Sequence, residues 1–160
     1  MVPLNPEELF EQALTLMEKG QYLKALEILK NLVENTDSSI YEIKPAYLSY
    51  YGYLTGTVHH DYKKAISMCN DAISKEFFHP DFYLNLGKLY LITGNKSMAI
   101  KTFYKGLKID KTHEALLAQI KELGIRKKPL FTFLHRANLL NKITGRIRNL
   151  ILKSRGRING

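Results

Sequence analysis

The sequence lacks tryptophan and has one cysteine, Cys69, among its 160 residues. A single cysteine excludes an internal disulfide framework. The chain also lacks an uncharged apolar run of about 18 residues, the length that a membrane-spanning helix needs. The first residues, MVPLNPEELFEQ, have acidic side chains where a secretory signal has basic ones before a long apolar run. We therefore expect a cytoplasmic protein.

The two parts of the chain differ in charge. No arginine precedes Arg126, and no acidic residue follows Glu122. Residues 1–122 have 14 lysines against 15 acids, whereas residues 123–160 have ten basic side chains and no acid. The net charge of +9 therefore comes from the C-terminal segment.

Signatures of catalysis are also lacking. There is no glycine-rich phosphate loop, no GxSxG motif and no paired-carboxylate signature. His59, His60 and Asp61 are adjacent, but a metal site needs three or four ligands, and no other group has the spacing to complete one. Cys69 occupies a position where the helical pattern places a packing residue, which argues against a nucleophile. We expect no enzymatic activity, no metal and no cofactor.

Residues 80–110 have the periodicity of two short amphipathic helices. The apolar residues recur at helical spacing on either side of Gly94–Asn95: Tyr83, Leu86, Leu89 and Tyr90, then Ala99, Ile100, Phe103 and Leu107. A helix with one apolar side must bury that side, so we expect the two helices to pack as a hairpin. Gly87 and Ala99 are small enough to bring the two backbones close together.

This hairpin resembles the tetratricopeptide repeat. The signature of that family is an aromatic residue, two residues, Leu-Gly, two residues and Tyr, followed by an Ala with an aromatic residue four positions later. The matching residues here are Tyr83, Leu86, Gly87, Tyr90, Ala99 and Phe103. Lys111 stands where the closing proline of the repeat usually falls.

Two earlier segments repeat the pattern, and prolines at Pro6, Pro45 and Pro80 mark the three starts. In residues 6–36, small and apolar residues keep the spacing of the third repeat: Ala13, Gly20, Ala25 and Leu29. Residues 45–78 match more loosely and contain one extra residue, which we place between two helices in residues 56–61. The intervals between the starts are close to the period of about 34 residues, and three repeats are about the minimum for a stable stack.

The last part of the chain predicts two further helices. Residues 111–123 are expected to cap the stack with Ala115, Leu116, Ile120 and Leu123. Residues 138–153 form an amphipathic pattern with a basic side. The resemblance implies a right-handed α-solenoid of three tetratricopeptide hairpins, and the residue pattern adds a capping helix and a basic C-terminal amphipathic helix, so we expect an all-α protein. We expect a repeat domain at residues 1–124 and a basic extension at residues 125–160.

The resemblance also implies a site. In this family, the first helix of each repeat lines a concave groove that binds a peptide or a helix. The groove residues expected here are Phe10, Leu14, Met17, Ser49, Tyr53, Leu84, Lys88 and Leu91. These residues are mostly apolar, which suits an apolar peptide or an amphipathic helix. We therefore predict a non-enzymatic protein-interaction module, an adaptor or scaffold whose groove binds either an external protein or the chain's own C-terminal helix.

The basic segment leaves three interpretations open. It packs on the stack with a solvated basic face, it lies on an anionic membrane surface, or it binds nucleic acid. Self-association is a further option for the chain. The residues expected to contact anions are Arg126, Lys127, Lys128, Arg136, Lys142, Arg146, Arg148, Arg155 and Arg157.

Overall fold

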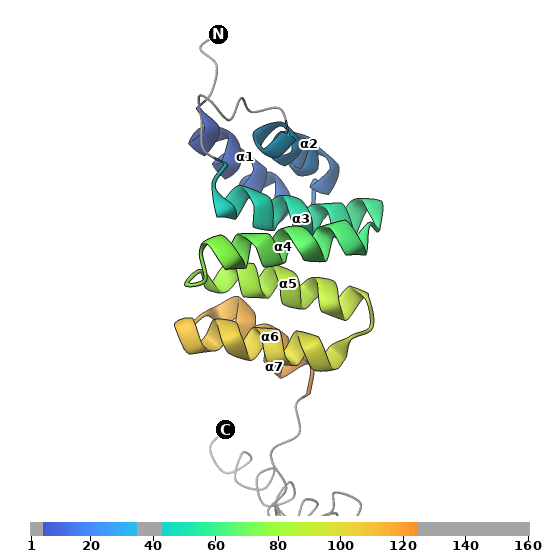
Figure 1. Cartoon of the computed structure of the whole chain (residues 1–160), viewed down its shortest axis with the longest axis vertical. Coiled ribbons are helices and arrows are strands. Elements are labelled where there is room, and N and C mark those ends of the chain that lie inside the picture. The colour runs from blue at the N-terminus through green and yellow to red at the C-terminus, as the bar shows by residue number, and fades with distance from the viewer. Residues whose placement is uncertain (1–4, 35–42, 125–160) are drawn as a thin grey trace, which may run out of the picture. The chain divides into compact units, whose positions relative to one another are not determined.

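A computed structural model describes residues 5–34 and 43–124 (Figure 1). All elements in these ranges are helices: α1 (Pro6–Glu18), α2 (Tyr22–Glu34), α3 (Pro45–His59), α4 (Tyr62–Lys75), α5 (Pro80–Ile92), α6 (Lys96–Ile109) and α7 (Glu114–Glu122). They lie in one compact unit, Met1–Leu123. The all-α class predicted from the sequence is confirmed.

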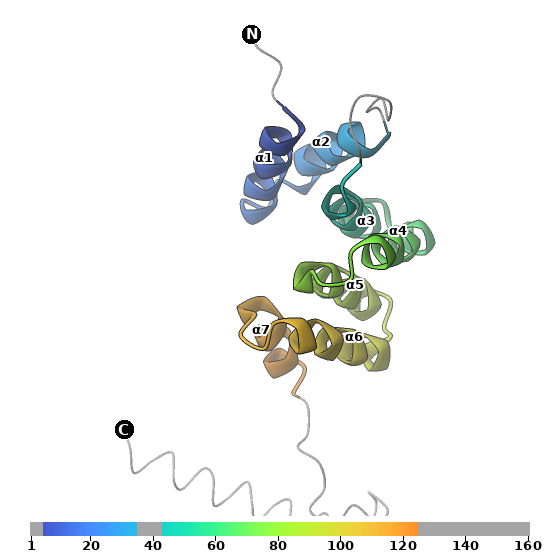
Figure 2. The ribbon, with the colours of Figure 1, turned by 60° about the vertical axis from the view of Figure 1, so that its left-hand side comes forward.

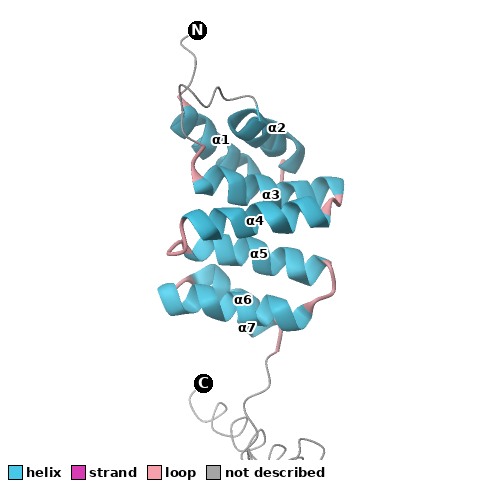
Figure 3. Ribbon diagram, in the orientation of Figure 1, coloured by secondary structure: helices cyan, strands magenta, loops and turns pink. Residues whose placement is uncertain are grey.

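The first six helices form three hairpins that follow one another along the stack (Figures 2 and 3). Within each hairpin the two helices contact each other, and α3 also contacts α2 and α5. Each hairpin packs mainly against its neighbours in the chain, as expected for a solenoid. The helix α7 packs on α6.

Prolines and side-chain caps start the helices. Pro6, Pro45 and Pro80 stand in the first turns of α1, α3 and α5, where a missing N–H group breaks no helical hydrogen bond. Side-chain oxygens cap the starts of α4 and α6. Asp61 Oδ1 accepts a hydrogen bond from the Lys64 N–H at 3.1 Å, and Asn95 Oδ1 accepts one from the Met98 N–H at 3.2 Å.

Two glycines end the first helices of the outer hairpins. Gly20 and Gly94 have φ angles of +70° and +76°, which glycine adopts without steric cost. The following N–H groups bond back to the helix, Gln21 to the Leu16 carbonyl at 2.8 Å and Asn95 to the Tyr90 carbonyl at 2.7 Å. The equal spacing of these glycines in the sequence therefore reflects one repeated turn.

The middle hairpin accommodates its extra residue differently from our prediction. The stretch from Gly56 to His59 continues α3, and only His60 and Asp61 connect α3 to α4. His60 replaces the turn glycine, with a φ angle of +58°. Helical hydrogen bonding and the packing of Gly56 against Ala65 and Leu89 favour the longer helix over a longer loop.

The close approach of helices within a hairpin depends on small residues. Phe103 is fully buried, and a Cβ atom at Gly87 would lie 2.9 Å from its Cζ atom and closer to two other ring carbons. In the middle hairpin, Gly52 approaches the Sγ atom of Cys69, which occupies the position of Phe103. Cys69 is also fully buried, and its thiol donates to the Ser49 carbonyl at 3.4 Å. Its place in the core agrees with a packing role.

The helix α7 caps the stack as predicted. Leu116 is fully buried in a cluster with Leu84, Ala99 and Phe103, and Ile120 and Leu123 pack against the same cluster. Ala115, expected to share this contact, is exposed. The imidazole of His113 fixes the start of α7, since Nδ1 accepts from the Leu116 N–H at 3.3 Å and Nε2 lies 3.1 Å from Asp81 Oδ1.

The predicted C-terminal amphipathic helix lies outside the described residues, so that helix and the domain boundary at residue 124 stay predictions. In the ranges that the structure does describe, no helix combines the length and apolar character needed to cross a membrane.

The substitution Gly87→Ala tests the contact between α5 and α6. Helix propensity alone would stabilise the protein by about 1 kcal/mol. The clash with the Phe103 ring is expected to outweigh this gain and lower the free energy of unfolding by about 1–3 kcal/mol. Urea unfolding followed by circular dichroism measures the change. The loss of unfolding free energy should be smaller in a Phe103→Leu background, because the aromatic ring is gone. A Gly87→Ala protein that is more stable than wild type would contradict the proposed packing.

The reactivity of Cys69 tests the core of the middle hairpin. Burial raises the pKa of this thiol to about 12, so the reactive thiolate is scarce even in mildly alkaline solution. We expect an aromatic disulfide reagent to leave the native protein unmodified and to label one thiol after unfolding in urea. Absorbance of the released thiolate reports the reaction, and the single cysteine makes the assignment unambiguous. Rapid labelling of the folded protein would place Cys69 outside the core.

Candidate functional site

The predicted groove residues lie on α1, α3 and α5, the first helices of the three hairpins. Three ring contacts join these helices, one of them between Phe10 and Tyr47 at 4.9 Å between centroids. The Phe10 ring lies 5.5 Å from the Tyr50 ring between centroids, edge to face, and thus joins α1 to α3. The Lys88 Nζ atom lies 5.3 Å from the centre of the Tyr53 ring and joins α5 to α3. One face of α3 therefore lies beside residues of both neighbouring first helices.

Two of the eight predicted residues are buried. Ser49 is fully covered, and its hydroxyl accepts from the Asn85 amide at 3.2 Å. Leu84 is 7% exposed and packs in the cluster that includes Leu116 of α7. Both side chains hold helices together, so only the other six predicted residues have appreciable exposed surface.

Those six are half-buried: Phe10, Leu14, Met17, Tyr53, Lys88 and Leu91. Most of the apolar members also pack against the buried core. Leu14 differs, because it belongs to none of the three apolar clusters found among the described residues. Among the six predicted residues, Leu14 is therefore the apolar side chain least committed to the core.

Tyr50 also belongs to this surface, although sequence reasoning did not select it. Its ring packs on Phe10, and burial raises the pKa of its hydroxyl, with the charges of Asp81 and Glu11 raising it further. The signal was available in the alignment of the repeats, because Tyr50 corresponds to Glu11 in the first hairpin. Because three of the four residues 50–53 are tyrosines, the sequence alone did not decide which of them lies on this surface.

Tyr51, its neighbour, points to the other helix layer. Its hydroxyl donates to Glu34 Oε1 of α2 at 2.6 Å, and the Lys64 ammonium lies 3.2 Å from the same oxygen. Burial and the hydrogen bond to Glu34 raise the pKa of Tyr51 to about 12. Tyr51 therefore links the hairpins on the side away from Tyr50.

Lys88 is the one lysine on the first helices, which have no arginine. Burial lowers the pKa of its ammonium group, while Asp81 opposes this shift. The ammonium lies over the Tyr53 ring, an arrangement that offsets part of the desolvation cost.

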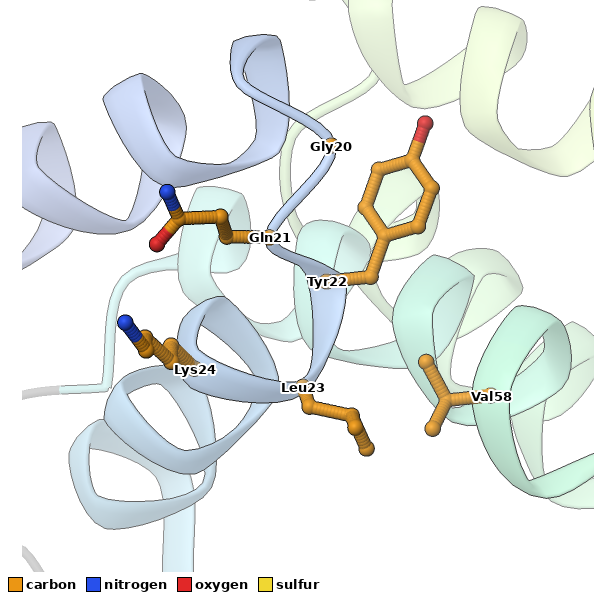
Figure 4. A pocket seen from close by; sticks show the side chains of 6 residues that line it. All are labelled: Gly20, Gln21, Tyr22, Leu23, Lys24 and Val58. Atoms are coloured by element: carbon orange, nitrogen blue, oxygen red, sulfur yellow. The ribbon is translucent and has the colours of Figure 1, made fainter.

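A shallow depression of about 450 Å³ lies elsewhere, between the α1–α2 turn and the end of α3 (Figure 4). Its lining is Gly20, Gln21, Tyr22, Leu23, Lys24 and Val58. The depression contains none of the predicted groove residues. Within the described ranges, no group of three or more His, Cys, Asp or Glu side chains could hold a metal ion.

The nine basic residues predicted to contact anions fall outside the described residues. They comprise Arg126, Lys127, Lys128, Arg136, Lys142, Arg146, Arg148, Arg155 and Arg157. Their role stays a prediction from the sequence.

Comparison with known proteins supports the repeat assignment. Residues 80–113 match the tetratricopeptide repeat family. No curated protein matches the sequence. The crystal structure of YrrB, a TPR protein with an unusual peptide-binding site, has 18% identity and a TM-score of 0.57. The similarity covers 75% of this chain, which spans 59% of YrrB.

Two other crystal structures share the fold. PcrH of Pseudomonas aeruginosa, in complex with the chaperone binding region of PopB, has 19% identity and a TM-score of 0.55, over 77% of this chain and 99% of PcrH. MamA has 23% identity and a TM-score of 0.54, over 76% of this chain and 71% of MamA. The third hairpin therefore matches the tetratricopeptide repeat family, and the described helices share the fold of these TPR proteins.

Proposed function

We propose that this protein is a non-catalytic protein-interaction module whose groove binds the apolar side of a peptide or an amphipathic helix. The observation that carries the proposal is the half-buried face of the first helices, which includes Leu14, Phe10, Tyr50 and Tyr53. Apolar and aromatic side chains that share one partly exposed face favour a partner that buries them.

The fold neighbours support this class of function. YrrB has a peptide-binding site, and PcrH binds a segment of PopB. Fold similarity alone does not define a partner, so the proposal rests on the residues of this chain.

Binding would gain free energy mainly from removing apolar surface from water. Burying one leucine side chain contributes about 1.5–3 kcal/mol. The aromatic rings of Phe10 and Tyr50 are already fixed against each other, so little side-chain entropy is lost when a partner covers them.

The substitution Leu14→Glu tests the groove. A neutral amphipathic peptide with leucines on one side and glutamines on the other serves as the probe. We expect Leu14→Glu to weaken its binding at least about tenfold, because an apolar contact is lost and a carboxylate must be desolvated. Titration calorimetry measures the affinity, and circular dichroism checks that the variant is folded.

Leu23→Glu is the matched control. Leu23 is 71% exposed and lies on α2, so the same change there should leave the affinity unaltered. Leu91 is a less suitable test site, since it packs in the cluster that holds α7. Equal affinities for wild type and Leu14→Glu would refute the groove as the binding site.

A further inference from the structure

Charges are segregated between the two helix layers of the hairpins. The first helices, α1, α3 and α5, have five acidic residues and one lysine, Lys88. The second helices, α2, α4 and α6, have nine lysines and three acidic residues. The layer of first helices therefore has a net negative charge, which comes from α1, and the layer of second helices is basic.

The acidic groups border the apolar face. Glu11 on α1 and Asp81 on α5 both act on the Tyr50 hydroxyl of α3, where they add to the effect of burial in raising its pKa. Two carboxylates from the outer hairpins thus lie within electrostatic range of one tyrosine in the middle of the surface. Asp81 is 42% exposed and remains open to a further contact beside His113.

On α1, Glu11 and Glu18 are the acids without a compensating contact in the described part of the chain. Glu7 pairs with Lys44, and Glu8 accepts from the Asn5 N–H in a capping box. Among the described residues, no base forms an ion pair with Glu11 or Glu18. Lys88 lies over Tyr53 and feels the charge of Asp81, so it does not neutralise α1.

We propose that the groove recognises a basic amphipathic segment, whose aliphatic side contacts Leu14, Phe10 and Tyr53 and whose Lys or Arg side chains pair with Glu11 and Asp81. This inference rests on the proposed function and adds the charge of the partner to it. Complementary charge fixes the orientation and register of such a segment, while the apolar contacts hold it. Because four of the five acids of the first helices lie on α1, we expect the basic residues of the bound segment to lie at the α1 end.

Two probe peptides test the charge preference with the full-length protein. Each is about five helical turns long with leucines on one side, and the opposite side has lysines in one peptide and glutamates in the other. Fluorescence anisotropy measures both affinities. The part of the binding that is lost in Leu14→Glu defines groove binding and separates it from attraction to the basic residues beyond 124.

We expect the lysine probe to bind the groove more tightly than the glutamate probe, with a preference that falls as salt is added. The double substitution Glu11→Gln and Asp81→Asn should weaken the lysine probe about two- to tenfold, as expected for two partly exposed ion pairs. Replacing the exposed acid Glu27 on α2 by Gln is the control and should change nothing.

Other outcomes distinguish a failure of the charge inference from a failure of the proposed function. Equal groove binding of both probes would refute the charge inference and leave the proposed function standing. Tighter binding of the glutamate probe, lost in Lys88→Gln, would identify an anionic partner and also overturn the inference. A Leu14-dependent dimer in light scattering that excludes both probes would make a second copy the occupant and overturn it as well. If Leu14→Glu affects neither probe, the proposed function itself fails.

Discussion

The contact between Gly87 and Phe103 determines how closely the two helices of a hairpin approach. Without a side chain at Gly87, the Phe103 ring lies directly against the α5 backbone and is completely buried. Gly106 permits the next approach in the same way, since a Cβ atom there would lie 2.6 Å from Leu116 of α7. At both contacts, α5 with α6 and α6 with α7, a glycine on one helix makes room for a large side chain on the next.

The signals that sequence analysis could use were those that depend on neighbours in the chain. Prolines at helix starts, Gly20 and Gly94 at turns, and the pairing of Gly87 with Phe103 all act within one hairpin. Leu116 could be predicted to cap the stack because an exposed last hairpin needs a cover. Local stereochemistry and the repeat period were sufficient for this part.

The remaining features depend on contacts between hairpins, which a repeat pattern describes poorly. Ser49 falls at a groove position by its spacing, but the amide of Asn85 reaches it from the next hairpin and helps to bury it. The length of α3 was also missed, because His60 adopts a turn conformation usually left to glycine. The charge segregation became visible only when each residue could be assigned to a helix layer.

The helix α3 explains why an apolar face can remain ordered without a partner. Tyr51 binds Glu34 on the outer side, and the Ser49 carbonyl accepts the thiol of Cys69. These two contacts tie α3 to α2 and to α4. Tyr50 and Tyr53 therefore keep their places beside Phe10 and Lys88. A surface fixed in this way loses little conformational entropy on binding, so the modest apolar area of a short segment can suffice for affinity.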